Sequence, residues 1–537
     1  MQRDLFGRLL GLSIEQKIDI KKVLTYPLTP VPFSLCHIDG TICKTDKSVL
    51  IKSLEKINPE QVQNVDVAII DGFFLLHLMK EVPQTYRNIS KKILQMVTAY
   101  NAGIIAIIFD RYFKPSIKDN EHTLRGTENR NYVISGPDQI RPSDFSAELK
   151  NINFKEALVN FLVEHWASDE MAPYFGMKVI YINFDFCYQY KVNNMKVEKT
   201  IDYNLSCAAH EEADTKIVYY VCNIDFDSTI LIRCSDTDVF IIMLGNMDHV
   251  ISSLQIYMHV GVGNAQRYIN ISKLYDTLGE SLCMSLPGFH AFTGCDYNPA
   301  FFKKGKKKPL TLLCSDEKFQ QAFTNLGDKN ISNSAEVFEI LEEFVCRMYN
   351  IKKINDVNTA RFEIFTKAFK AKDINEHFAT KAKNYDASTL PPCKSELHQQ
   401  LLRARYITSI WRNAHLKCPT DLQPIEHGWQ EIDNKYECLW FEGEQLPTFV
   451  QDVVIQPDDE YDLGKQYFYF FLHTVNLTHF YTVNNFYISP FIKVDTNEEM
   501  QCDNEYYDDD DDDDDDDDYN DFDDSQKYDS DDDNEDL

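Results

Sequence analysis

Four short apolar runs rich in β-branched residues alternate with longer stretches of helical periodicity, starting at Val65. Their sequences are VDVAII, GIIAIIF, KVIYINF and STILIRC. Strands that are buried on both faces have such continuous apolar runs, and helices between them make the parallel connections. The pattern therefore predicts an α/β domain over residues 61–330, with a parallel sheet flanked by helices.

The rest of the chain divides into four parts. Residues 1–60 are predicted to be a partly helical extension, interrupted by the prolines of TYPLTPVPF, which stop a helix. Helical periodicity dominates residues 331–455 and predicts a mainly helical region, followed by an aromatic-rich segment at 456–500. Residues 501–537 are low-complexity acid, and we expect this poly-Asp tail to be disordered.

Most of the negative charge belongs to the tail. The chain of 537 residues has a formal net charge of −31, and Asp503–Leu537 contributes −21 of it through 22 acidic residues and one lysine. The remaining −10 does not attract nucleic acid, so any such contact must come from a local basic patch. With 44% hydrophobic residues the chain has enough apolar surface for a large core.

The cysteines and the N-terminal segment predict a soluble intracellular protein with no membrane partner. The 14 cysteines form no CxxC pair and show no spacing typical of a zinc site or a disulfide framework. The N-terminal MQRDLFGRLLGLSIEQK lacks the apolar core of a signal peptide, and the uncharged apolar stretches are too short to span a bilayer.

Four carboxylates follow predicted strands. Asp71 ends VAIID, Asp110 follows IIAIIF, and Asp236 and Asp238 follow ILIRC. Ligands of parallel α/β sheets bind at the carboxyl ends of the strands. The i, i+2 spacing of Asp236 and Asp238 lets both side chains reach ions that lie close together.

Three more acids lie in short motifs further along. Glu212 and Asp214 belong to HEEADTK, where a helix is predicted to begin and its dipole favours ionised acids, and Asp296 belongs to GCDYN. Gathering all seven acids in one pocket costs several kcal/mol unless divalent cations neutralise them, which points to Mg²⁺ or Mn²⁺. HEEAD is no zinc-protease motif, because Asp214 stands where the second histidine is needed. Each acid taken alone is more often a helix N-cap or a turn residue.

The order of the motifs resembles that of flap endonucleases and XPG-type repair nucleases, a branch of the PIN-like fold. The motifs are VAIIDGFFLLH, IIFDRYFKPSIK, HEEADTK, RCSDTDVF and TGCDYNPAFFKKGKKK, and the resemblance covers about residues 61–320. It implies that two Mg²⁺ or Mn²⁺ ions are bound by Asp71, Asp110, Glu212, Asp214, Asp236, Asp238 and Asp296. Asp214 departs from the family pattern, which has Glu there, and its reach is shorter by one methylene.

The resemblance also gives roles to basic residues. Lys118 and Arg125 have the spacing of the family's lysine and arginine at the base of a helical arch, which implies electrophilic contact with the scissile phosphate; the alternative is two solvated charges on a loop. A lysine run after Asp296 occupies the place of a hairpin that grips duplex DNA. Its members, predicted to bind nucleic acid, are Lys303, Lys304, Lys306, Lys307 and Lys308. The same run also fits a nuclear localisation signal, and both interpretations favour a nuclear protein over a cytoplasmic one.

A closer similarity links the chain to a group of uncharacterised animal proteins, similar to Asteroid-type XPG relatives and with the character of mobile elements. The shared stretches are RDLFGRLL, YPLTPVPF, HEEADT, SDTDV and LPGFHAFTGCD. Because MQRDLFGRLL begins inside the first of these stretches, we expect further sequence upstream.

The function expected from the resemblance is divalent-metal-dependent hydrolysis of phosphodiester bonds, in DNA rather than RNA and in flap, branched or single-stranded substrates. In the two-metal mechanism, Asp236, Asp238 and Asp296 are assigned to one ion and Asp110, Glu212 and Asp214 chiefly to the other. Asp71 either orients waters or shares the first ion. The alternative is a catalytically inactive PIN-like interaction scaffold, because a fold alone does not establish activity.

The poly-Asp tail suggests a separate hypothesis. Asp508–Asp518 is an unbroken run of eleven, and extended residues advance about 3.3–3.6 Å, near the roughly 3.4 Å phosphate spacing of a DNA strand. The tail could imitate single-stranded DNA and inhibit the enzyme in cis. The alternatives are a solubilising tail, contact with histones or other basic proteins, and a neutral codon expansion.

Overall fold

The computed structural model describes residues 19–37, 40–55, 62, 64–119, 130–328, 334–368 and 386–448. The chain divides into two units, Met1–Phe480 and Tyr481–Leu537. The second unit and the predictions for 456–500 and 501–537 lie outside the described residues. The fold below is that of the first unit.

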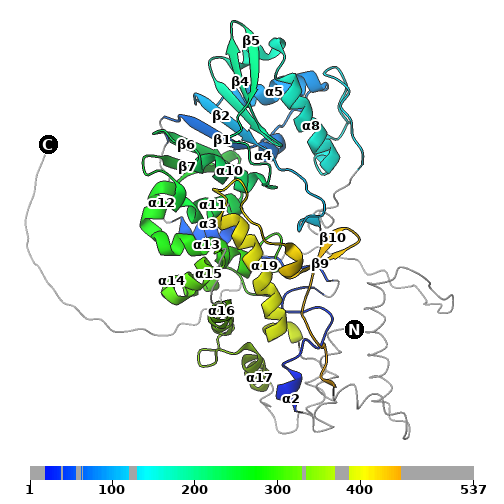
Figure 1. Cartoon of the computed structure of the whole chain (residues 1–537), viewed down its shortest axis with the longest axis vertical. Helices are drawn as coiled ribbons and strands as arrows, with labels where there is room; N and C mark the ends of the chain where they lie inside the picture. The colour runs from blue at the N-terminus through cyan, green and yellow to red at the C-terminus, as the bar shows by residue number, and fades with distance from the viewer. Residues whose placement is uncertain are drawn as a thin grey trace, which may run out of the picture. The chain divides into compact units, whose positions relative to one another are not determined.

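An eight-stranded mixed sheet forms the centre of the first unit, in the order β5-β4-β3-β2-β1-β6-β7-β8 (Figure 1). Five adjacent strands run parallel: β3 (Val179–Asn183), β2 (Ile104–Ile108), β1 (Val67–Asp71), β6 (Thr229–Arg233) and β7 (Gln255–Val260). The four apolar runs predicted the first four of these strands, and β7 was not predicted. The edge strands are antiparallel, namely β4 (Cys187–Asn193), β5 (Lys196–Ile201) and β8 (Arg267–Asn270). The α/β class is confirmed, and the expectation of a purely parallel sheet is corrected.

A tight hairpin explains one antiparallel edge. Between β4 and β5 the chain turns at Asn194 and Met195, whose φ angles of 50° and 60° are both positive. Two consecutive residues in this region make the two-residue turn whose twist suits a hairpin, so β5 must return antiparallel. Continuous apolar runs alone do not predict this turn, because neither of its residues belongs to one.

Helices cover both faces of the sheet, which explains the continuous apolar runs in its central strands. Ala68 and Ile70 of β1 point into one core with α5 (Tyr86–Thr98) and α8 (Ile152–His165). Ile69 points into the other core with α10 (Ala213–Cys222) and α11 (Thr237–Gly245). Successive side chains of a strand alternate between faces, so a strand covered on both sides is apolar at every position. The shorter helices of this region are α4 (Gly72–His77), α7 (Phe145–Glu148), α9 (Ala172–Phe175) and α12 (Ile271–Leu278).

The helical region beyond the sheet shares the second of these cores. Helix α13 (Glu280–Thr293) contacts α11, α15 (Glu317–Asn325) and α19 (Lys394–Arg412), and Trp411 belongs to the same cluster as Phe289. The remaining elements are α14 (Lys307–Ser315), α16 (Ser334–Met348), α17 (Val357–Ala368) and the hairpin of β9 (Trp429–Ile432) and β10 (Lys435–Cys438). In the described ranges, no helix combines the length and hydrophobicity that a bilayer span requires.

The N-terminal extension is also part of this core. It contains the short helix α2 (Ile20–Val23) and helix α3 (Ser48–Leu54), which packs against α11 and α14. Helix α3 contributes Leu50, Ile51 and Leu54 to the same hydrophobic core that contains Ile69 of β1. The extension therefore packs against α11, the helix that begins at the predicted ligands Asp236 and Asp238.

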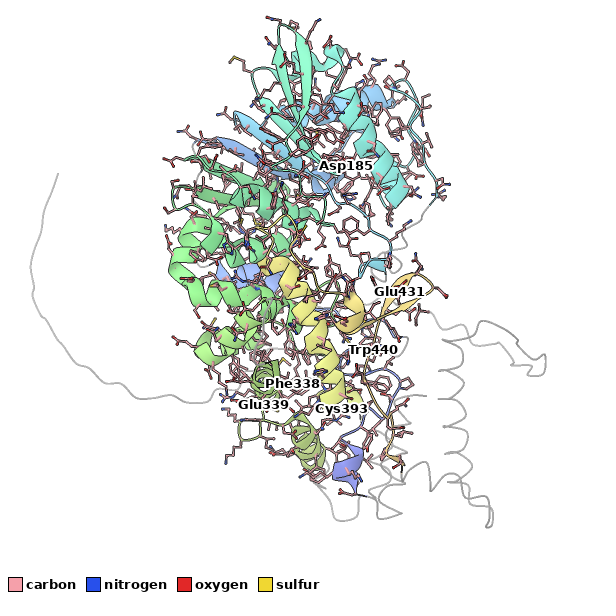
Figure 2. All side chains as sticks on the ribbon, viewed as in Figure 1. Asp185, Phe338, Glu339, Cys393, Glu431 and Trp440 are labelled. Carbon is pink, nitrogen blue, oxygen red and sulfur yellow. The ribbon has the colours of Figure 1, made fainter. Side chains whose placement is uncertain are left out.

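A cavity of about 810 Å³ opens between α16 and α19. Phe338 and Glu339 of α16 line it, near Cys393 at the start of α19 (Figure 2). His398 packs edge-on against Phe338, with ring centres 5.5 Å apart. None of the predicted site residues lines this cavity, so it is separate from the site described below.

Close packing of α13 against α15 gives a stability prediction at Gly288. A methyl group there would collide with the carbonyl oxygen of Phe323, and because that oxygen belongs to the backbone it cannot swing aside. We expect Gly288→Ala to lower the free energy of unfolding by about 1–3 kcal/mol, measured by urea denaturation. Gly305→Ala is the matched control, since a methyl group there meets nothing within 4 Å. Equal unfolding midpoints for the two variants would contradict this packing.

Candidate metal centre

Three adjacent parallel strands deliver carboxylates to one edge of the sheet. Asp71 is the last residue of β1, Asp110 lies two residues beyond the end of β2, and Asp236 lies three residues beyond β6. Strand β1 pairs with both neighbours, with Asp71 opposite Ile108 and Ile70 opposite Arg233. The register therefore brings the three strand ends together, as expected for ligands of a parallel sheet.

Asp71 combines a structural contact with an unfavourable electrostatic position. Its Oδ1 accepts the backbone N–H of Phe74 at 3.0 Å and so caps α4, while the Cys234 thiol donates to Oδ2 at 3.6 Å. Burial, together with repulsion from Asp110 and Asp236, raises the pKa of Asp71 to about 7. The N-cap interpretation of this aspartate is thus correct, and the acid also faces two others.

Helix α10 begins at the same edge. Asp110 accepts the backbone N–H of Ala213 at 2.7 Å, which ties the end of β2 to the first turn of this helix. Glu212 immediately precedes the helix and Asp214 lies in its first turn. Burial raises the pKa of Glu212, and burial followed by repulsion from Asp236 raises the pKa of Asp214 well above its ordinary value.

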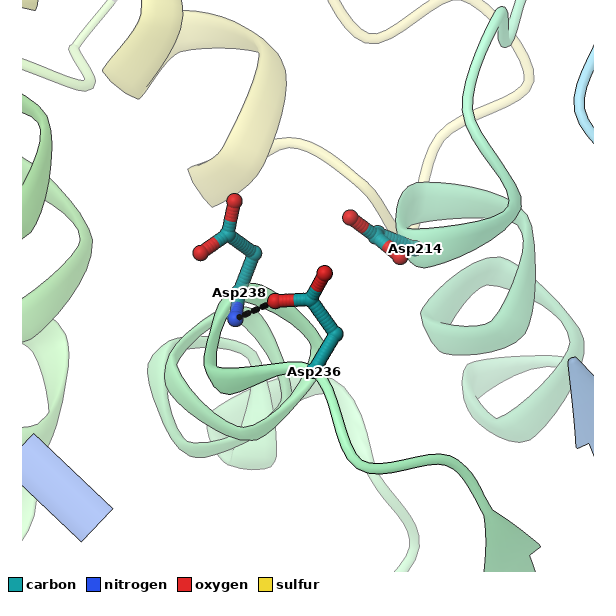
Figure 3. Close-up of side chains that lie close together, drawn as sticks. All are labelled: Asp214, Asp236 and Asp238. Atoms are coloured by element: carbon teal, nitrogen blue, oxygen red, sulfur yellow. Dashed lines mark hydrogen bonds between the residues drawn. The ribbon is translucent and has the colours of Figure 1, made fainter. Parts of the chain in front are cut away.

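Asp214, Asp236 and Asp238 form the tightest group of acids. Each presents one oxygen within 4.8 Å of the others, and Asp214 reaches from α10 towards the pair at the start of α11 (Figure 3). Asp236 accepts the backbone N–H of Asp238 at 2.9 Å (Figure 3). Burial raises the pKa of both Asp236 and Asp238. Converging carboxylate oxygens are ligands that hard divalent cations prefer, so this group could hold a metal ion.

Lys118 lies at this centre and makes an ion pair with it. Its ammonium is 2.7 Å from Glu212 Oε1 and 5.7 Å from the centre of the Tyr297 ring, whose hydroxyl also donates to Glu212. Burial opposes the charge of Lys118, but Glu212 and Asp110 outweigh it and raise its pKa. The alternative of a solvated charge is wrong for this buried lysine. Arg125 lies outside the described residues.

Glu211 is a site residue that the sequence analysis did not identify. The Ser116 hydroxyl donates to its Oε2 at 3.0 Å and the backbone N–H of Phe113 donates to its Oε1 at 3.3 Å. These bonds fasten the loop between Asp110 and Lys118 to the start of α10. Burial raises the pKa of Glu211 to about 7. Glu211 belongs to the HEEAD motif, but its role could not be predicted from that motif, because its partner Ser116 lies 95 residues earlier in the chain.

His290 is a second unpredicted residue and positions Asp238. Its Nε2–H donates to Asp238 Oδ1 at 3.0 Å, and its ring stacks on Trp411 with centres 5.5 Å apart. Burial lowers the pKa of His290 well below its ordinary value, so the imidazole is neutral. His290 belongs to the LPGFHAFTGCD stretch, but no motif spacing in the sequence indicates that it contacts Asp238.

Lys47 is the third unpredicted residue, and it comes from the N-terminal extension. Its ammonium lies 2.9 Å from Asp236 Oδ1, 3.1 Å from Asp238 Oδ1 and 3.5 Å from Asp296 Oδ2. Burial opposes this charge, but the three carboxylates outweigh it and raise the pKa of Lys47. All seven predicted acids thus belong to one connected set, with Asp296 joined to it through Lys47.

The lysine run after Asp296 differs in part from the expectation. Lys306 is 1% exposed and donates to the Thr293 hydroxyl at 2.9 Å and the His290 carbonyl at 3.3 Å. Its ammonium therefore binds the C-terminal end of α13 and cannot contact a phosphate, which corrects the prediction for this residue. The side chains of Lys303, Lys307 and Lys308 are exposed and that of Lys304 is half-buried. Lys304 lies over the Tyr349 ring at 4.5 Å, and Lys308 donates to Asn350.

Comparison of the sequence with protein-family models and with curated proteins found no match.

Proposed function

We propose that this chain is a divalent-metal-dependent nuclease of the PIN-like, flap-endonuclease type that hydrolyses phosphodiester bonds in DNA. One observation carries the proposal: seven carboxylates from five separate motifs gather at one edge of the sheet, and three of them converge within 4.8 Å. The order β3-β2-β1-β6-β7 of the parallel strands supports a PIN-like fold, with the acids at the carboxyl ends of its central strands.

The charge balance supports a bound cation. Among the described residues, two ammonium groups make ion pairs with the seven acids: Lys47 and Lys118. Buried carboxylates that are left uncompensated are destabilising, and carboxylate oxygens suit Mg²⁺ or Mn²⁺. Five of these acids are half-buried, and Glu212 and Asp238 are buried, so the centre is open enough for an ion to enter.

Different residues of this centre would bind the metal ion, attract the scissile phosphate and bind the DNA backbone. Asp214, Asp236 and Asp238 would hold the ion, with Asp71 and Asp110 beside them. A bound Mg²⁺ or Mn²⁺ supplies an activated water and neutralises charge on the phosphoryl group. Lys118 places a positive charge next to Glu212, where it would attract the scissile phosphate. Exposed Lys303 and Lys307 would bind the DNA backbone.

A second candidate function is favoured by Lys47. Because its ammonium already neutralises part of the acidic cluster, the same residues could serve a catalytically inactive interaction scaffold, as for a domesticated mobile-element protein. The excess of carboxylates over ammonium groups argues for the nuclease. A scaffold would bind DNA or a protein partner with or without divalent ions.

The deciding experiment incubates the full chain with labelled 5′-flap, nicked and single-stranded DNA, and with their RNA counterparts, in Mg²⁺, Mn²⁺ or EDTA. We expect cleavage of DNA that requires the metal. Lys118→Met should reduce the rate by about 10²-fold while Mn²⁺ still binds, because it removes an electrophile and no ligand. Lys114→Met, which changes an exposed lysine on the same loop, is the control. Metal-independent DNA binding with no cleavage of any substrate would favour the scaffold.

A further inference from the structure

The ammonium of Lys47 occupies a position that suits a metal ion. Its three carboxylate partners, Asp236, Asp238 and Asp296, are the set that the sequence analysis assigned to one of two ions. One nitrogen within 2.9–3.5 Å of three acids from two different segments replaces a cation in both charge and position. The two-ion scheme therefore conflicts with a residue of the chain itself.

A packed helix fixes Lys47 in this position. Lys47 immediately precedes α3, whose Leu50, Ile51 and Leu54 are buried in the core, and α3 packs directly against α11, the helix that carries Asp238. The backbone N–H of Ser48 also binds Asp46 Oδ1 at 2.8 Å. The Lys47 backbone is thus held at a constant distance from the acids, unlike a lysine at the end of a surface loop.

Backbone hydrogen bonds fasten the same extension to the loop that follows Asp296. The Ala300 N–H donates to the Cys43 carbonyl and the Phe302 N–H to the Ser34 carbonyl, both at 2.8 Å. The two segments that carry Lys47 and Asp296 are therefore joined by backbone hydrogen bonds as well as by the ion pair. Moving the ammonium out of the centre would require breaking this connection or turning the lysine side chain towards solvent.

The contacts divide the centre into two parts. Asp236 Oδ1 makes the ion pair with Lys47 and also accepts the backbone N–H of Asp238. Its other oxygen, Oδ2, remains for a metal ion that Asp214 would also bind. A second divalent ion among Asp236, Asp238 and Asp296 would lie within about 4 Å of an ammonium group, where like charges repel strongly in a poorly solvated site. Asp214 and the other oxygens of Asp236 and Asp238, with Asp71 and Asp110 beside them, remain for one ion.

We propose that Lys47 is a resident cation that takes the place of a second metal ion, so that each chain binds one Mg²⁺ or Mn²⁺. This inference rests on the proposed function, because it concerns the same metal centre. Lys47 then brings to the Asp238–Asp296 side of the centre the positive charge that a two-metal enzyme takes from its second ion.

The test counts the Mn²⁺ ions bound per full-length chain, by calorimetry and by electron paramagnetic resonance of free Mn²⁺. We expect one ion for the wild type and two for Lys47→Ala, in which the vacated carboxylates accept an ion. Lys47→Arg retains the cation and should bind one ion. Lys52→Ala, which changes an exposed lysine on the same helix, is the control and should also bind one. Circular dichroism establishes that each variant is folded.

The possible results separate the two proposals. Two ions in the wild type, or one ion in both the wild type and a folded Lys47→Ala, would overturn the role of Lys47 and leave the metal-dependent nuclease intact. No Mn²⁺ binding by either protein would overturn the metal centre itself. If Lys47→Ala fails to fold, the wild type and Lys47→Arg still decide, because two ions in either one contradict a resident cation.

Discussion

Asp236→Asn is expected to lower DNA cleavage by about 10³-fold and to abolish Mn²⁺ binding at concentrations that saturate the wild type. Metal ions contribute several kcal/mol of transition-state stabilisation, and each 1.36 kcal/mol is a factor of ten in rate. Asp236 contacts Lys47 and the Asp238 backbone, and an oxygen of it converges with Asp214. It therefore joins both parts of the centre, and we expect its charge to matter more than that of any other acid there.

The substitution separates chemistry from folding. Asparagine keeps the size of the side chain and an oxygen that can still cap α11 through the Asp238 N–H, so the unfolding midpoint should change little. Single-turnover cleavage rates and Mn²⁺ titrations provide the measurement. Asp276→Asn, which changes an exposed carboxylate on α12, is the matched control and should retain wild-type rates. Equal cleavage by Asp236→Asn and wild type would mean a contaminating nuclease and would remove the centre from the mechanism.

The thermal stabilisation by Mn²⁺ is expected to grow as the pH rises from about 5 to about 8. The folded pKa of Asp71 is about 7 against an ordinary 3.8, and that of Glu211 is about 7 against 4.5. A carboxyl with a raised folded pKa contributes stability that is complete below its ordinary value and is lost as the pH rises through its folded value. Without metal, this contribution therefore disappears between about pH 4 and about pH 7.

A divalent ion held in the centre compensates the negative charge that Asp71 and its neighbours gain when they lose their protons. We expect Mn²⁺ at 100 times its Kd to stabilise the protein by about 2.7 kcal/mol near pH 8 and by much less near pH 5, where protons compete. Melting curves with Mn²⁺ and with EDTA give the measurement at each pH. The difference between the two curves is the quantity to compare, because buried His210 and His290 have lowered pKa values and titrate with the opposite sign. A difference that is constant with pH, or one that persists in Asp236→Asn, would place Mn²⁺ elsewhere.

Features set by local sequence were the predictable ones. The strands β1, β2, β3 and β6 lie within the four apolar runs, and Asp71, Asp110 and Asp236 follow three of them because a strand end is a property of a short segment. Parallel pairing then places these ends at one edge without further information. The convergence of the acids therefore followed from strand position, and the α/β class from apolar periodicity.

The residues that escaped prediction act across long sequence separations. Lys47 meets its partners only after α3 has packed on α11, and His290 reaches the same oxygen of Asp238 from α13. Nothing in the neighbouring sequence of either residue indicates these contacts. Lys306 is the opposite case, because the lysine-rich run predicted an exposed side chain. Its side chain is instead buried and binds the C-terminal end of α13. Tertiary packing decided each of these cases.

The connection between the N-terminal extension and the loop after Asp296 sets the order of events during synthesis. Lys47 and Asp296 are 249 positions apart, and translation at about 5–20 residues per second takes about 12–50 s to cover that distance. Throughout this interval the nascent chain carries Lys47 without the loop that secures it. The candidate metal centre can thus be completed only late, so the N-terminal part of the proposed nuclease would leave the ribosome before its centre is in place.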